Sequence, residues 1–335
     1  MNFTLKAKFN LAITSHHKHT HQRPLKIIMK SKIIPSLLIL LGAGLLISQN
    51  PKGENAPNGA EEKIAQAIPA AAHAKPAAPR KMLLFSATAG FRHQSIATGK
   101  IALAELGKKT GAYETVVSDD LANFDADKIK QFDVICFLST TQDVFTPKDI
   151  KKLSPDEAKS AQEKSLTYRK NLMEFIESGK GFVGIHAATD TLYNWPEYGR
   201  MIGGYFDGHP WNAGTEVQID VEKGQEKHPL AAMFDGQSMN FKEEIYQLKD
   251  PYSAKRQHLL LRLNVEKSAK VGGLKRKDGD YAVAWARHQG KGRVFYCSLG
   301  HNHEMYWNPK ILSHYLAGIQ WAIGDFKAEV THTID

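Results

Sequence analysis

The chain has 335 residues, of which 42% are hydrophobic and 24% are charged, as is ordinary for a globular protein with a buried core. Its formal net charge is +9, but residues 1–32 carry seven basic residues and no acidic residue, which leaves only +2 for the remainder. This distribution excludes a nucleic-acid-binding surface as the main interpretation.

An apolar run at residues 33–47 follows the basic segment. Its length is typical of the core of a signal peptide and short for a membrane-spanning helix. Met29 stands directly before the last basic residues, which favours it over Met1 as the true start. We therefore expect residues 1–50 to be a basic head with a signal peptide or a membrane anchor, and the protein to be exported to the periplasm or the cell exterior.

Residues 51–80 are rich in alanine and proline and contain no aromatic residue, which predicts a flexible linker. Beyond them, short apolar runs alternate with amphipathic segments, a pattern typical of βαβ units around a largely parallel sheet. A polar stretch at 143–166 begins as a loop and leads into a helix that ends at Gly179. The expected strands lie at 82–86, 113–118, 133–138 and 182–185, and the expected helices at 95–109 and 125–132.

The second half of the chain has strands with little helix between them, which indicates antiparallel pairing. Residues 289–292, Gln-Gly-Lys-Gly, are typical of a hairpin turn. The expected strands lie at 215–221, 243–248, 258–265, 281–287 and 293–298, and the expected helices at 196–202 and 309–324. We predict one α/β domain over residues 81–327, with a doubly wound, mainly parallel sheet and additional antiparallel strands, and a tail at 328–335.

His186 stands in a tight turn of small residues directly after the buried strand at 182–185. A titratable side chain at the carboxyl end of a parallel strand lies where open α/β sheets bind their ligands. The same position carries a nucleophile in several hydrolase folds. The alternative is a histidine that makes only a structural hydrogen bond.

His93 and His301 also follow predicted strands, and His209 lies in a loop. Because the loops after parallel strands gather at one edge of a doubly wound sheet, we expect His93, His186 and His301 to converge there. His209 joins them from its loop in this prediction, and the acidic pair Glu243-Glu244 supplies a carboxylate.

Two chemistries suit converging histidines with a carboxylate. Neutral imidazoles with Asp or Glu bind a divalent transition metal, most simply Zn²⁺ with an open position for water. Alternatively, a histidine beside a carboxylate acts as a general acid or base. No short-range ligand pair such as His-Glu-x-x-His selects between them. The expected metal ligands are His93, His186, His209 and His301, and the expected catalytic residues are His186, His301, Glu244 and Asp190.

Aromatic residues are frequent in the same loops. Flat aromatic faces beside polar groups suit a sugar ring. Each aromatic residue taken alone is better explained as covering the edge of the sheet, but together they favour a carbohydrate-sized polar ligand. The expected substrate-binding residues are Phe91, Arg92, His93, Trp195, Tyr205, His209, Trp211 and His303, and the expected partner is a small carbohydrate.

Five motifs in order resemble the ThuA-like, trehalose-utilisation family, and the resemblance covers residues 81 to about 325. They are Phe91-Arg-His-Gln-Ser-Ile96, Gly184-Ile-His-Ala-Ala-Thr189, Gly203-Gly-Tyr-Phe-Asp-Gly-His-Pro210, Glu243-Glu-Ile-Tyr246 and Gly292-Arg-Val-Phe-Tyr-Cys-Ser-Leu-Gly-His301. The resemblance implies a class I glutamine amidotransferase-like fold, a flavodoxin-like sandwich with added strands. That superfamily places a cysteine where this chain has His186, so amidotransferase chemistry is not expected here.

The resemblance also implies a link to the uptake or catabolism of disaccharides and keto-sugars. Together with the histidines, it predicts an enzyme that acts on a sugar derivative by hydrolysis, elimination or isomerisation. The alternative is a non-catalytic carbohydrate-binding or scaffolding module that uses the same cleft.

Overall fold

The computed structural model describes residues 55–331, and the structural statements below concern that part of the chain. The predicted signal-peptide or anchor segment lies outside the described residues. None of the helices within residues 55–331 combines the length and the apolar character that crossing a bilayer requires. The contacts of the described residues make one compact unit.

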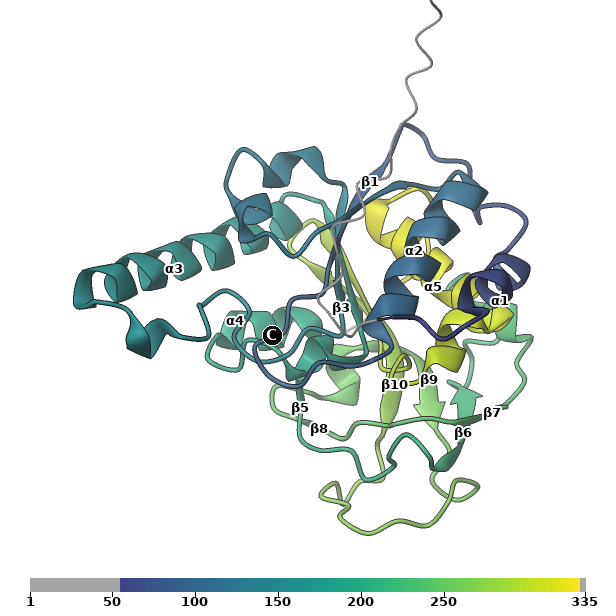
Figure 1. The fold of residues 1–335 in the computed structure, drawn as a ribbon. Helices are drawn as coiled ribbons and strands as arrows, with labels where there is room; N and C mark the ends of the chain where they lie inside the picture. The colour runs from purple at the N-terminus through teal and green to yellow at the C-terminus, as the bar shows by residue number, and fades with distance from the viewer. Residues whose placement is uncertain (1–54, 332–335) are drawn as a thin grey trace, which may run out of the picture. The chain divides into compact units, whose positions relative to one another are not determined.

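A nine-stranded mixed sheet forms the centre of this unit, in the order β2-β1-β3-β4-β11-β10-β9-β6-β7 (Figure 1). The first five strands of this order pair in parallel, and the others pair antiparallel. The predicted α/β fold, with a parallel core and added antiparallel strands, is confirmed. The strands are β1 (Lys81–Phe85), β2 (Glu114–Val117), β3 (Val134–Leu138), β4 (Gly181–Ile185), β6 (Glu216–Val221), β7 (Met239–Lys242), β9 (His258–Leu263), β10 (Ala282–Gln289) and β11 (Gly292–Cys297), with β5 (Tyr205–Phe206) and β8 (Leu248–Lys249) in a separate pair.

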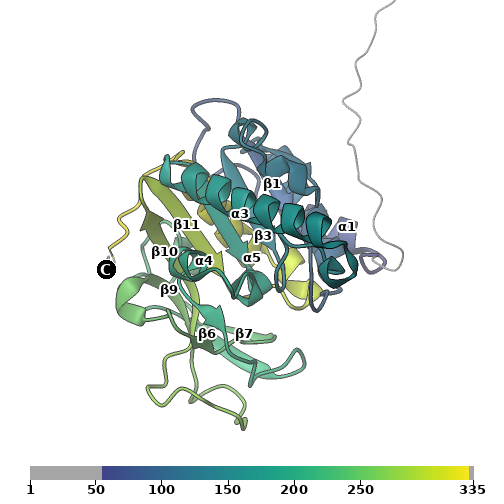
Figure 2. The ribbon, with the colours of Figure 1, turned by 90° about the vertical axis from the view of Figure 1, so that its left-hand side faces the viewer.

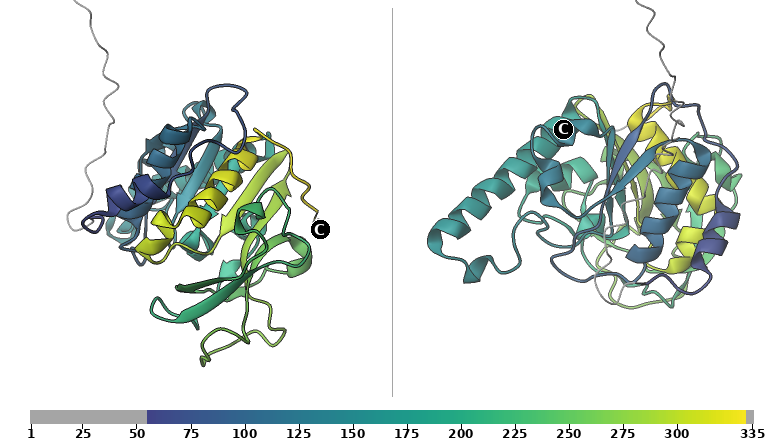
Figure 3. Two further views of the ribbon diagram at one scale, coloured as in Figure 1. Left: turned by 90° about the vertical axis from the view of Figure 1, so that its right-hand side faces the viewer. Right: turned by 45° about the horizontal axis from the view of Figure 1, so that its top comes forward.

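Helices cover both faces of the parallel part of the sheet. The helix α3 (Pro155–Glu177) and the short α4 (Pro196–Ile202) lie on one face, as Figure 2 shows. The helices α2 (Ile96–Thr110) and α5 (Pro309–Ile323) lie on the other face, in blue and yellow in the left-hand view of Figure 3. Side chains alternate between the faces along each strand, so that β4 contributes to both hydrophobic cores.

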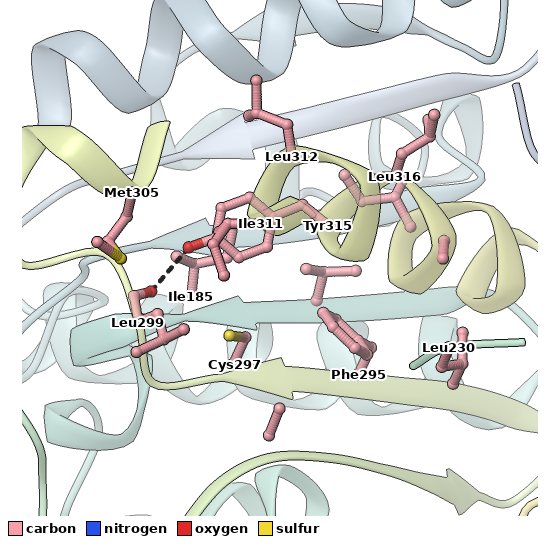
Figure 4. Packing of buried hydrophobic residues seen from close by; sticks show 14 of the residues in the cluster. Ile185, Leu230, Phe295, Cys297, Leu299, Met305, Ile311, Leu312, Tyr315 and Leu316 are labelled. Carbon is pink, nitrogen blue, oxygen red and sulfur yellow. Dashed lines mark hydrogen bonds between the residues drawn. The ribbon is translucent and has the colours of Figure 1, made fainter. Parts of the chain in front are cut away.

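The layer beneath α5 is closely packed. Figure 4 shows Ile185 of β4 and Phe295 of β11 among the apolar side chains of this helix. Tyr315 is fully buried there, and its hydroxyl donates a hydrogen bond of 2.8 Å to the carbonyl oxygen of Leu299. This bond ties α5 to the segment directly after β11, and so helps to fix the start of the loop that carries His301.

Local sequence explains where α3 begins and where α5 begins and ends. Ser154 and Glu157 form a reciprocal capping box at the start of α3. The Asn308 side chain accepts from two backbone N–H groups at the start of α5. Gly324 ends α5 at a φ of 95°, a conformation that glycine adopts at little cost.

Three segments differ from the prediction. Residues 125–132 form a 3₁₀ turn at Ile129–Gln131 and no α-helix. Of residues 243–248, predicted as a strand, Ile245 makes only an isolated bridge to Trp211, and β8 begins at the last residue. Part of the expected flexible linker is folded, because α1 (Ala60–Ala67) packs the buried Ile64 against the domain and the His73 backbone N–H donates to Gln320.

His314, in the middle of α5, makes folding stability depend on pH. Its Nδ1 lies 2.7 Å from the Leu230 carbonyl oxygen, and its ring packs between Phe234 and Phe295. Burial lowers its pKa from 6.5 to about 4. Because the folded-state pKa is below the unfolded one, the stabilising contribution is complete above pH 6.5 and is lost as the pH falls toward 4.

His314→Gln keeps an amide donor for the Leu230 carbonyl oxygen but has no group that titrates in this range. Between pH 7 and pH 4, we expect the free energy of unfolding of the wild type to fall by about 3 kcal/mol more than that of the variant. Urea unfolding at a series of pH values measures this difference. Parallel pH profiles for the two proteins would contradict it.

Candidate metal centre

Four side chains with metal-ligating atoms meet at the carboxyl edge of the sheet. They are His93 from the loop after β1, His186 after β4, His301 after β11, and Glu244 between β7 and β8. One potential ligand atom from each lies within 4.8 Å of the others. The ring centroids of the three histidines are 4.6 to 5.2 Å apart, with the rings nearly perpendicular. We call this set the His3Glu cluster.

His186 is held in a single orientation. It follows β4 directly with a φ of 51°, an uncommon conformation for a residue with a side chain, and it is fully buried. Its Nδ1 lies 2.8 Å from the carbonyl oxygen of Ser298. A carbonyl oxygen only accepts, so Nδ1 carries the proton and the lone pair of the neutral ring is on Nε2. That lone pair faces the other members of the cluster.

The carboxylate of Glu244 lies within ion-pair distance of three histidines. Its Oε1 lies 3.3 Å from Nδ1 of His301 and 3.8 Å from Nε2 of His186. Its Oε2 lies 3.4 Å from Nδ1 of His209, whose side chain is 47% exposed. The carboxylate therefore links the buried cluster to a histidine that solvent reaches.

Glu243, the neighbour of Glu244, holds the loop that carries His301. Its buried carboxyl group accepts hydrogen bonds of 2.8, 2.6 and 3.0 Å from the backbone N–H groups of Gly300, His301 and Asn302. Three consecutive donors on one carboxyl group fix the backbone path of this loop. The two adjacent acidic residues thus have different roles, since Glu243 binds the loop and Glu244 faces its histidine.

The environment sets the protonation of the histidines. Burial lowers the pKa of His93 to about 3, and the neighbouring His301 and His209 add to the effect. Burial also lowers the pKa of His186 well below 6.5. Burial also tends to lower the pKa of His301. The hydrogen bond and charge of Glu244 outweigh this effect, so the pKa of His301 is raised above its usual value. His93 and His186 are therefore neutral at neutral pH, the form in which histidine binds metals.

The donor set fits a divalent transition metal. Zinc binds imidazole nitrogens and carboxylate oxygens at about 2.0–2.2 Å, so that neighbouring ligands of one tetrahedral ion are about 3.4 Å apart. The observed spread of at most 4.8 Å exceeds that value by no more than about 1.4 Å. Nδ1 of His93 is buried and has no hydrogen-bond partner within residues 55–331. A metal ion would give this buried nitrogen the partner that it lacks. The Nδ1 contact of His186 is the orienting bond that metal-ligating histidines usually make.

Aromatic side chains surround the exposed side of the cluster. Phe91 is 66% exposed and its ring contacts that of His93 edge-on, with the centroids 4.8 Å apart. Phe206 stacks on His209 at 6.0 Å and contacts Tyr246 at 4.4 Å. A ligand that reaches the cluster therefore meets Phe91 and the ring of His209.

Several predicted substrate-binding residues have structural partners elsewhere. Trp211 is buried and donates to the Ala269 carbonyl oxygen, and the Tyr205 hydroxyl binds backbone groups that include the Trp195 carbonyl. Trp195 itself is 8% exposed and stacks on Tyr198. The three aromatic residues belong to the packing of the domain, as the alternative interpretation of loop aromatics allows.

Three polar residues from the predicted site also have other partners. Nδ1 of His303 lies 2.7 Å from the hydroxyl of Thr98 on α2, and its ring stacks on Trp307. Arg92 donates to the Ser86 carbonyl oxygen. Asp190 accepts from Tyr193, and burial raises its pKa.

Tyr246 contacts the cluster but is absent from the predicted site. Its buried hydroxyl lies 3.1 Å from Nε2 of His186. A sequence signal for it exists, because Tyr246 is two residues after Glu244 and such residues share a side of an extended segment. The Ser298 carbonyl that orients His186 has no such signal.

Comparisons with known proteins agree with this architecture. A family model described as ThuA, trehalose utilisation, matches residues 81–156 and 157–322. A ThuA-like protein from Bacteroides uniformis has a similar fold, with a TM-score of 0.55, 21% sequence identity, and coverage of 74% of this chain and 93% of that one. A ThuA-like protein from Parabacteroides merdae gives a TM-score of 0.47 at 16% identity, over 77% of this chain and 93% of its own. No curated protein sequence matches.

Proposed function

Since the chain belongs to the ThuA, trehalose-utilisation, family, we propose that it is an exported enzyme of carbohydrate metabolism with a zinc ion in the His3Glu cluster. The substrate in this proposal is a disaccharide, glycoside or keto-sugar, and the reaction is a hydrolysis, elimination or isomerisation. The observation that carries the proposal is the convergence of three histidines and one carboxylate within 4.8 Å.

The proposed roles follow from the environment of each group. His93, His186 and His301 hold the ion, which supplies Lewis-acid polarisation of a substrate oxygen. Glu244 and His209 form the pair that exchanges protons with substrate, because Oε2 and Nδ1 lie 3.4 Å apart and His209 is the exposed member. The exposed ring of Phe91 suits the C–H face of a sugar.

The test is a turnover assay on zinc-loaded protein. We expect product from at least one member of a panel of disaccharides, glycosides and 3-keto-glycosides, detected by mass spectrometry. A chelator should abolish the activity, and one equivalent of zinc should restore it. Absence of product across the whole panel would contradict an enzymatic role.

A carbohydrate-binding module is the second candidate, and the 66% exposure of Phe91 beside His93 favours it. The binding-module hypothesis predicts that calorimetry detects binding of a disaccharide while mass spectrometry detects no product.

Export is supported by the apolar run at 33–47 behind a basic segment. Cell fractionation tests it, and recovery of the protein in the cytoplasmic fraction would contradict it.

A further inference from the structure

Tyr246 lies directly against the most deeply buried histidine of the cluster. Its ring centroid is 4.7 Å from that of His186, and its hydroxyl is 3.1 Å from Nε2. Phe206 packs on the Tyr246 ring at 4.4 Å and helps to fix its position. Within the described part of the chain, the contact with Nε2 is the one hydrogen bond of this hydroxyl.

Nε2 of His186 has a single lone pair, and two partners compete for it. The Ser298 carbonyl oxygen holds the proton on Nδ1, so that Nε2 accepts the hydrogen bond from the Tyr246 hydroxyl. A metal ion in the cluster uses the same lone pair. Occupation of the site therefore removes the acceptor of Tyr246.

A buried hydroxyl without an acceptor is costly, so Tyr246 needs a new one. Glu244 is already engaged, because Oε1 faces His186 and His301 while Oε2 faces His209. The remaining acceptor is an oxygen atom of the molecule that occupies the open side of the ion. The hydroxyl is within reach of it, because it lies 3.1 Å from a nitrogen that itself binds the ion.

We propose that Tyr246 is a catalytic hydrogen-bond donor, whose hydroxyl leaves His186 when the metal binds and donates to a substrate oxygen at the ion. This inference rests on the metal site of the proposed function and adds a residue to it. It also narrows the substrate class, since the atom that binds at the ion must be an oxygen that accepts a hydrogen bond, such as the carbonyl oxygen of a keto-sugar. In this role the hydroxyl stabilises negative charge on that oxygen without giving up its proton.

The test compares Tyr246→Phe with the wild type by using zinc and two small ligands as probes. Phenylalanine keeps the ring and removes only the hydroxyl. Acetohydroxamate binds zinc through oxygen atoms that accept hydrogen bonds, whereas imidazole binds through nitrogen and offers no acceptor beside the ion. Tyr113→Phe is the matched control, because its hydroxyl is also buried but binds the Leu103 carbonyl oxygen on α2.

We expect Tyr246→Phe to bind zinc within about threefold of the wild type, as measured by competition with a chromophoric chelator. Its affinity for acetohydroxamate, followed spectroscopically with cobalt in the site, should fall about five- to tenfold, the effect of one hydrogen bond. The affinity for imidazole should be unchanged, and Tyr113→Phe should match the wild type with both ligands.

Equal acetohydroxamate affinity in the two proteins would overturn the inference while the metal site remained. Tighter zinc binding by Tyr246→Phe with unchanged acetohydroxamate affinity would also overturn the inference. It would mean that the hydroxyl only competes with the ion for the lone pair on Nε2 of His186. A wild-type protein that binds no zinc would contradict the proposed function itself, and this inference with it. Zinc affinity near that of the wild type also reports that the variant is folded at the site.

Discussion

Replacing His186 by alanine is expected to weaken zinc binding by more than the roughly 10- to 100-fold that loss of an outer-shell partner costs. The ring is fully buried, and its Nε2 faces the cluster because the Ser298 carbonyl holds Nδ1. Alanine removes this nitrogen and leaves the Ser298 carbonyl oxygen and the Tyr246 hydroxyl without their partner. Competition with a chromophoric chelator measures the affinity, and turnover on any active substrate should be lost in parallel.

His303→Ala is the matched control for this experiment. His303 is on the same loop as His301, two residues away, but its Nδ1 contacts Thr98 on α2. We expect this variant to bind zinc with the affinity of the wild type. Equal losses in the two variants would mean that zinc binds to surface histidines and not to the His3Glu cluster.

Replacing Glu243 by alanine is expected to lower the free energy of unfolding by about 4 kcal/mol, because it leaves three consecutive backbone N–H groups without their acceptor. The same change releases the loop of His301, so zinc affinity should fall by about 10- to 100-fold. Urea unfolding and chelator competition measure the two effects.

Glu304→Ala controls for the loss of an acidic residue, since Glu304 is exposed near the same loop. We expect it to change stability by less than about 0.5 kcal/mol. A Glu243→Ala variant as stable as Glu304→Ala would show that water or another group satisfies the three donors, and that Glu243 does not hold the loop.

The convergence of the histidines was predictable because it follows from topology. His93, His186 and His301 each come after a parallel strand, and parallel strands end at one edge of a sheet. The sequence pattern locates those strands well, since buried runs such as Gly181–Ile185 are continuous and apolar. Glu244 joins them although the strand predicted for it does not form.

Other features depend on contacts that the sequence does not encode locally. An aromatic residue in a loop points outward or inward with the same local pattern, so the exposed Phe91 and the buried Trp211 could not be told apart. The docking of α1 rests on a few apolar side chains, Ile64, Ala67 and Ile68, in a polar and alanine-rich segment. The bond between Tyr246 and His186 joins residues 60 positions apart.

The central claim is that His93, His186 and His301 bind one metal ion beside the carboxylate of Glu244. Anomalous diffraction at the zinc edge, from crystals of protein loaded with one equivalent of zinc, tests it most directly. The account predicts a single strong peak at about 2.0–2.2 Å from nitrogen atoms of the three histidines, on the side of the cluster where Glu244 lies. A peak elsewhere, or none among these four side chains, would contradict it.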